Sequence, residues 1–138
     1  MDVLPLRLPP GADLRRALEA AVAGQAATSA FVVAGIGSLT EARLRYAGET
    51  DEAVLPGPLE VVSLSGSIGP SGAHLHMVVS DAAGRVRGGH VGHGNTVRTT
   101  AEVLLAPLPG WSLLRAHDPA TGFGELVVRG PGAAQNAD

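Results

Sequence analysis

The chain lacks cysteine and lysine altogether and carries only four aromatic residues among its 138. Without cysteine, disulfides and thiolate metal ligands are excluded, so any bound metal must be held by nitrogen and oxygen atoms. With so few aromatic rings, the core must be built of Val, Leu, Ala and Ile. Such a core favours many short strands rich in β-branched residues.

A basic surface and membrane-crossing segments are lacking as well. The ten basic residues are all Arg and stand against 13 acidic ones, for a net charge of −3. This balance argues against a free-standing nucleic-acid binder, which normally shows a basic stripe. No apolar run approaches the roughly 18 residues of a membrane helix, and the start, Met1 to Pro5, has no signal-peptide pattern. We therefore expect a soluble, cytoplasmic protein without membrane contact.

The chain length suits one domain, which we place over residues 1–129, followed by a flexible tail over 130–138. The pattern from Ala12 to Ala23 predicts a helix capped by Asp13 and closed by Gly24. Strands are predicted at residues 3–8, 28–36, 39–46, 59–68, 96–106, 111–116 and 124–129, with a turn at 35–38 and a polar connector over 48–58. Between residues 72 and 91 the chain is predicted to form a hairpin in which Asp81 pairs with Arg85. Because one helix stands among many strands without βαβ alternation, we predict an α+β fold. It is a mainly antiparallel β-sheet of about seven or eight strands with one principal helix near the N-terminus.

Three histidines, His74, His76 and His90, fall within seventeen residues. Side chains two apart on a strand point to the same face, which places His74 and His76 about 6 to 7 Å apart. The segment from Asp81 to Gly84 has the chemistry of a type I turn closed by a left-handed glycine. That turn sets His76 opposite His90, with His74 diagonal to it, so the three rings converge.

The convergence depends on this register. A two-residue loop at Ala82 and Ala83 sets His90 opposite Leu75, on the other face, and disperses the rings. We prefer the first register because a two-residue loop favours Asn or Gly at its centre, and this segment offers only alanines there.

Three neutral imidazoles suit a borderline cation such as zinc, or another divalent cation, and leave a fourth position open as in catalytic sites. The alternative is that the histidines are half-buried and hydrogen-bonded to carbonyls, or to one another across a subunit contact. No residue pattern indicates binding of an organic cofactor, because neither GxGxxG nor GxxxxGK[ST] is present.

Other titratable residues are weaker candidates for a role at this site. Glu102 is the best carboxylate for a general acid or base, although a charge-paired strand residue explains it equally. Asp81 is interpreted as the turn-forming residue, His93 as a loop residue between glycines, and His117 as part of a surface turn. Arg98 suits either an anionic ligand or plain solvation.

Several motifs occur in a recognisable order: His74-Leu75-His76, Ser80-Asp81, Gly88-Gly89-His90 and Thr99-Thr100-Ala101-Glu102. With the segment from Gly57 to Ile68, they closely resemble the PPC domain, the plants-and-prokaryotes-conserved domain. The resemblance covers residues 3 to about 129. It implies a homotrimer of α+β subunits, and His74, His76 and His90 match the positions that look like a metal site in prokaryotic relatives.

The resemblance also carries a DNA-binding label, because plant members join the domain to an AT-hook. This chain has no Arg-Gly-Arg-Pro core of an AT-hook, and its composition offers no basic substitute. Prokaryotic members are usually the bare domain, which is the organisation we expect here.

Three functions stay open from the sequence. The first is a trimeric binding or regulatory module with a His-based metal site and a small-molecule ligand. The second is a metal-dependent enzyme acting on a small polar substrate, and the third is a nucleic-acid binder. The sequence names neither the metal, the ligand, nor a partner beyond a second copy of the chain.

Overall fold

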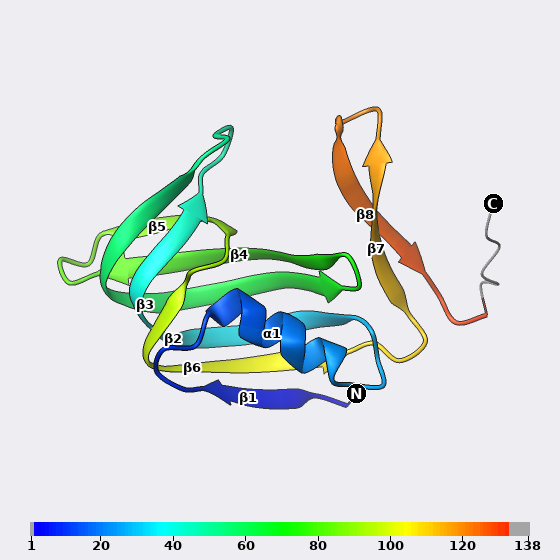
Figure 1. Cartoon of the computed structure of the whole chain (residues 1–138), viewed down its shortest axis with the longest axis horizontal. Helices are drawn as coiled ribbons and strands as arrows, with labels where there is room; N and C mark the ends of the chain where they lie inside the picture. The colour runs from blue at the N-terminus through cyan, green and yellow to red at the C-terminus, as the bar shows by residue number, and fades with distance from the viewer. Residues whose placement is uncertain (1, 133–138) are drawn as a thin grey trace.

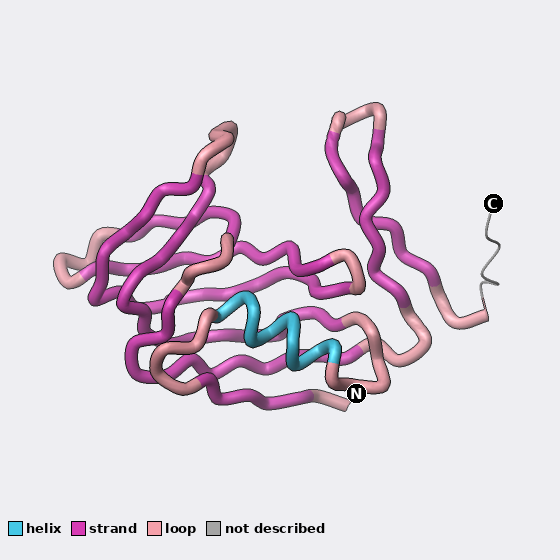
Figure 2. The backbone as a smooth tube through the Cα atoms, in the orientation of Figure 1, coloured by secondary structure: helices cyan, strands magenta, loops and turns pink. Residues whose placement is uncertain are grey.

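A computed structural model describes residues 2–132 of the chain. Most of this part is strand, arranged in one large antiparallel sheet and one separate hairpin, with a single helix on a face of the large sheet (Figure 1, Figure 2). The elements in chain order are β1 (Leu4–Leu8), α1 (Leu14–Ala23), β2 (Ala30–Arg45), β3 (Glu52–Gly69), β4 (Gly72–Asp81), β5 (Val86–Val91), β6 (Thr96–Pro107), β7 (Ser112–Asp118) and β8 (Phe123–Arg129). The predicted fold class, α+β with a mainly antiparallel sheet and one early helix, is confirmed.

The large sheet has the order β1-β6-β2-β3-β4-β5. The ends of β2 and β3 curve out of its plane, and β2 also pairs with β5 through Leu44 and Val91 (Figure 1). This second pairing curls the sheet. Of the two strands that carry the three histidines, β4 pairs with β3, and β5 pairs with the end of β2.

The helix forms where the sequence predicts it. Asp13 accepts a hydrogen bond from the backbone N–H of Arg16 and so caps the first turn. Leu14, Leu18 and Val22 recur at helical spacing and are buried against the inner face of the sheet. The core is therefore aliphatic, as the composition requires, and lies between α1 and the sheet.

The predicted turn at residues 35–38 is wrong. The chain runs straight through these residues as β2, which is one strand where the sequence suggested two. The glycines instead allow neighbouring strands to approach closely. A Cβ added to Gly37 would lie 2.6 Å from the carbonyl oxygen of Thr100, and one added to Gly35 would lie 2.9 Å from the Cβ of Leu64. The polar connector over 48–58 is likewise shorter than predicted, because β3 already begins at Glu52.

The C-terminal strands also differ from prediction. The prediction of a single sheet included them, but β7 and β8 pair only with each other and form a hairpin that projects from the large sheet (Figure 1). Of the predicted tail, residues 133–138 lie outside the described part of the chain. Within residues 2–132, no helix is long and apolar enough to cross a bilayer.

Candidate metal centre

The β4–β5 hairpin is built around the side chain of Asp81. Its Oδ1 accepts hydrogen bonds from the backbone N–H groups of Ala83 (2.9 Å) and Arg85 (3.0 Å), while Gly84 adopts the left-handed φ of +74°. The backbone N–H of Arg85 is the main cause that lowers the pKa of Asp81, and the backbone N–H of Ala83 and the guanidinium of Arg85 lower it further, so the carboxylate stays ionised. This turn sets the register in which His76 lies opposite His90, as predicted.

The three imidazoles meet at one point of the sheet's outer face. Nε2 of His76 lies 3.2 Å from Nε2 of His74 and 3.1 Å from Nδ1 of His90, and the remaining pair, His74 to His90, is 3.3 Å apart. The rings of His74 and His90 stack with 12° between their planes, and His76 meets both edge-on. Leu75 and Met77, on the other face of β4, are buried in the core. The apolar side chains and the imidazoles therefore lie on opposite faces of the strand.

The nitrogen triangle fits a tetrahedral cation. Zinc–nitrogen bonds of about 2.0 to 2.1 Å at tetrahedral angles separate the ligand nitrogens by about 3.3 to 3.4 Å, close to the observed spacings. Each inward nitrogen must be either a donor or an acceptor, because a neutral imidazole has one of each. Two of the three therefore share a role, and at least one contact of the triangle is repulsive unless a cation lies between the lone pairs.

The surroundings of His74 and His90 favour the neutral form of these two rings. Burial lowers the pKa of His74, and the charges of Arg115, His76 and His90 lower it further, against an opposing effect of Glu125. Burial, then Arg45 and His76, lower the pKa of His90. A neutral imidazole is the form that binds a metal, so the site is prepared for ligation near neutral pH.

A groove of about 310 Å³ borders the cluster. It lies between the outer face of the sheet and the β7–β8 hairpin, and its lining consists of Phe31, Ser65, Gly66, Ser67, His74, His76, Arg115 and Leu126. Ser67 and Ser65 lie on β3 directly opposite His74 and His76. A metal held by the histidines would therefore be accessible to a ligand from a groove with mixed polar and apolar walls.

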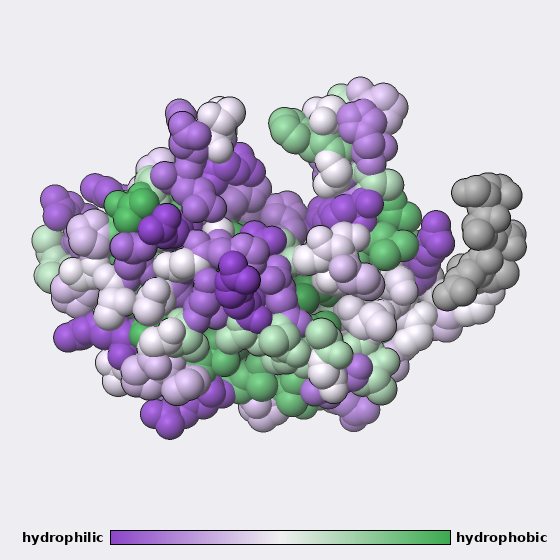
Figure 3. Space-filling model, in the orientation of Figure 1, coloured by the Kyte–Doolittle hydropathy of each residue, from purple (hydrophilic) through white to green (hydrophobic). Residues whose placement is uncertain are grey.

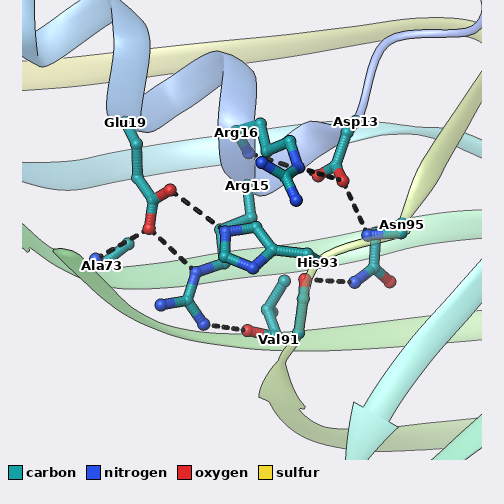
Figure 4. Close-up of polar contacts among 10 residues, drawn as sticks. Asp13, Arg15, Arg16, Glu19, Ala73, Val91, His93 and Asn95 are labelled. Carbon is teal, nitrogen blue, oxygen red and sulfur yellow. Dashed lines mark hydrogen bonds and ion pairs between the residues drawn. The ribbon is translucent and has the colours of Figure 1, made fainter.

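A second polar network lies behind the cluster, on the helix side of the sheet (Figure 4). Nε of Arg15 pairs with Oε1 of Glu19 at 2.9 Å, and that oxygen also accepts the backbone N–H of Ala73 at 3.0 Å. Nη1 of Arg15 donates to the carbonyl of Val91 at 2.9 Å. Ala73 precedes His74 and Val91 follows His90, so this one ion pair ties α1 to both strands that carry the ligands.

His93 joins the same network rather than the cluster. Its Nε2 lies 3.2 Å from Oε2 of Glu19, and it sits in the loop between β5 and β6, as predicted (Figure 4). Burial by itself raises the pKa of Glu19, but the hydrogen bonds from Arg15, His93 and Ala73 outweigh it and lower that pKa. The carboxylate is therefore held as an anion at neutral pH.

The remaining candidates lie elsewhere. Glu102 is exposed on β6 opposite Arg7 and Ile36, and the grooves that it lines contain no histidine. His117 was predicted in a surface turn, but it is the penultimate residue of β7 and pairs with Gly124. Arg98 is exposed on β6.

Sequence reasoning missed the groups that the tertiary structure brings to the cluster. Arg115 and Glu125 come from the hairpin, and Arg45 comes from the far end of β2. No local pattern marks them, because the separations from His74 along the chain are large and the hairpin's placement was not predictable from periodicity. Glu19 and Arg15 show only the i, i+4 spacing of a helix ion pair.

Comparison with known sequences places these features in context. A family model of the Plants and Prokaryotes Conserved (PCC) domain, the family that the motifs resemble, matches residues 1–109. Among curated proteins, the chain is similar to the bifunctional protein GlmU of Synechococcus sp. (strain JA-2-3B'a(2-13)), with 43% identity over 129 residues. That match covers 94% of this chain and 20% of the relative, so the chain spans about a fifth of the length of the curated relatives it matches.

Solved structures share the whole fold. A hypothetical protein of Salmonella superposes with a TM-score of 0.90 at 38% identity, covering 94% of both chains. A metal-containing protein of Archaeoglobus fulgidus superposes with a TM-score of 0.79 at 29% identity, covering 92% of this chain and 94% of its own.

Proposed function

Because this chain belongs to the Plants and Prokaryotes Conserved (PCC) domain family, we propose that it is a small binding or regulatory module with a metal centre. The metal is a divalent cation of the zinc type, held by His74, His76 and His90. The active form is a homotrimer, and its ligand is a small molecule. The observation that carries this proposal is the triangle of ring nitrogens with sides of 3.1 to 3.3 Å.

The donor set supports zinc over harder cations. Three imidazoles with no carboxylate suit zinc, copper or nickel, whereas magnesium and calcium prefer oxygen ligands. The relative from Archaeoglobus fulgidus is described as a metal-containing protein, which agrees with a metal in this fold. The similarity to GlmU is confined to a fifth of that protein, so it assigns no activity to this chain.

The trimer is supported by apolar surface that one copy leaves uncovered. Val33, Ile36 and Val62 are exposed on the outer face of β2 and β3, and Phe123 and Val128 are exposed on β8. Apolar residues also gather on the projecting hairpin in the space-filling view (Figure 3). Patches of this kind mark protein contacts, and a hairpin without a sheet partner is suited to pack against a neighbouring copy.

The metal is tested by elemental analysis of protein purified without an affinity tag. We expect close to one zinc-type ion per chain, and its loss in a His74→Ala/His76→Ala/His90→Ala variant. A His93→Ala/His117→Ala variant is the matched control, because it removes histidines outside the cluster and should retain the metal. Equal, negligible metal in all three proteins contradicts the proposal.

The trimer is tested by the mass in solution. Light scattering after size-exclusion chromatography should give three times the chain mass of 13.9 kDa at micromolar concentration. A monomer across the whole concentration range contradicts the trimeric part of the proposal and leaves the metal centre to be judged on its own test.

The groove beside the histidines favours a second candidate function, a metal-dependent enzyme acting on a small polar substrate. A zinc-bound water has its pKa lowered to about 7 and becomes a nucleophile, with the groove admitting the substrate. Hydrolysis of a simple activated ester by the zinc-loaded protein, lost in the triple histidine variant, supports this function. Equal rates with and without the three histidines contradict it.

Nucleic-acid binding is the third candidate, and the net charge of −3 counts against it. Binding through phosphates weakens steeply as salt rises. A duplex that binds at 50 mM salt and is released at 200 mM would support it, and an absence of binding at low salt would contradict it.

A further inference from the structure

The positively charged side chain of Arg115 lines the groove between the sheet and the β7–β8 hairpin, next to the proposed metal site. Nη2 of Arg115 on β7 donates to Oγ of Ser67 at 3.3 Å, and Ser67 lies directly opposite His74. The guanidinium and the imidazoles of His74 and His76 therefore border one space of about 310 Å³.

Arg115 has no carboxylate within ion-pair distance among the residues that the structure describes, and it lines the groove together with His74 and His76. Arg15, Arg43 and Arg85 each pair with a carboxylate at 2.8 to 3.0 Å. The recorded hydrogen bond of Arg115 occupies one of the five N–H donors of a guanidinium. Glu125, the acid whose charge reaches the cluster, is held by the hydroxyl of Thr121 at 3.0 Å.

Two of the side chains that line the groove are large and apolar. Phe31 on β2 is 41% exposed and Leu126 on β8 is 39% exposed. Phe31, Ser67 and His74 lie in one row across β2, β3 and β4, and Leu126 is paired with Arg115 in the hairpin. A ligand in the groove would thus meet apolar surface beside both the histidines and the guanidinium.

We propose that this groove binds a small organic anion. Its carboxylate or phosphate group lies between the metal and Arg115, and its apolar body packs on Phe31 and Leu126. A planar guanidinium suits both oxyanions, and the open coordination position of a three-histidine metal accepts an oxygen. The volume is at the lower end of small-molecule sites, which favours a ligand the size of one ring over a nucleotide or polymer. This inference rests on the metal centre proposed above.

The experiment uses the full chain loaded with Co²⁺, whose visible absorption reports changes in coordination. Acetate, benzoate and inorganic phosphate are titrated separately. We expect each anion to change the spectrum. Benzoate should bind more tightly than acetate, because its ring can pack on Phe31 and Leu126. The phosphate arm distinguishes phosphate-bearing from carboxylate-bearing ligands.

Variants assign the contacts. Arg115→Gln should weaken benzoate binding by about tenfold, the size of a charge-assisted contact, with unchanged cobalt affinity. Arg129→Gln removes the same charge from the same hairpin and should change binding less than about twofold. Phe31→Ala should weaken benzoate while leaving acetate unchanged, and circular dichroism confirms that each variant folds.

Two results would overturn the inference while leaving the metal centre intact. One is normal cobalt binding with equal benzoate affinity in the wild type and in Arg115→Gln, and the other is benzoate binding that is identical with and without cobalt. Failure to bind cobalt, read from the cobalt titration before any anion is added, refutes the metal centre and with it this inference.

Discussion

Two polar clusters lie on opposite faces of the same two strands, and they differ in how their charges and hydrogen bonds are satisfied. On the helix side of the strands, the carboxylate of Glu19 contacts the side chains of Arg15 and His93 and accepts the backbone N–H of Ala73. Its oxygens therefore have partners of opposite polarity. On the outer face, His74, His76 and His90 contact one another through ring nitrogens alone.

The difference separates a group of residues that stabilises the fold from one arranged for a ligand. A carboxylate surrounded by donors is stable as it stands, and removing it leaves a partly buried guanidinium without its anion. Three converging nitrogens, two of which must share a donor or acceptor role, cannot all pair favourably with one another, whereas a cation that accepts three lone pairs satisfies them together. We expect substitutions in the two clusters to affect different properties.

The largest effect is expected for His76→Ala on metal affinity. Even an outer-shell partner of a metal ligand is worth about 10- to 100-fold in affinity, so losing a ligand should cost at least about 100-fold. The unfolding free energy of the metal-free protein should change by less than about 0.5 kcal/mol, because His76 is exposed. Competition with a chromophoric chelator measures the first, and urea unfolding measures the second.

Next in size is the effect of Glu19→Ala on stability, expected at about 2 kcal/mol because it removes partners from Arg15 and Ala73. Glu41→Ala is the matched control: it breaks an ion pair with Arg43 that is also near 3.0 Å but more exposed, and should cost less than about 1 kcal/mol. Urea unfolding of both variants is the measurement. Equal losses would remove the distinction drawn between the clusters.

A smaller effect is expected at the turn that aligns the histidines. Gly84→Ala introduces a side chain at φ +74°, where open space surrounds the Cβ, so only backbone strain contributes, about 1 kcal/mol. Gly84→Asn should cost less, because Asn tolerates this conformation. Metal affinity should be retained in both, since Asp81 still holds the turn. Loss of metal in Gly84→Ala alone would show that the turn controls the site more tightly than we infer.

The smallest effect is the acid sensitivity of the metal-free fold. The folded state lowers the pKa of His74 and His90, so below about pH 6.5 the unfolded chain binds more protons. Stability should therefore fall as pH drops from 6.5 towards the folded pKa values, and a His74→Gln/His90→Gln variant should lose part of that slope. Urea unfolding between pH 7.5 and 5.5 measures it, and identical slopes would contradict the assignment.

Local patterns predicted much of this molecule because they depend on neighbours in the chain. The cap at Asp13, the turn from Asp81 to Gly84 and the pairing of His76 with His90 are all confirmed. One error arose because glycine is common both in turns and at close contacts between strands. Gly35 and Gly37 suggested a turn, yet they allow neighbouring strands to approach inside one long strand, which only the packed sheet reveals.

Composition, periodicity and turn chemistry act over a few residues, and they suffice to specify the aliphatic core, the early helix and the histidine hairpin. The surroundings of the histidines depend instead on how distant segments pack. Arg115 approaches them from a hairpin outside the large sheet. Glu19 and Arg15 on the helix bind the backbone of the histidine strands at residues 54 and 76 positions later in the chain. Such contacts join distant segments through packing, and no local pattern specifies which distant segments will meet.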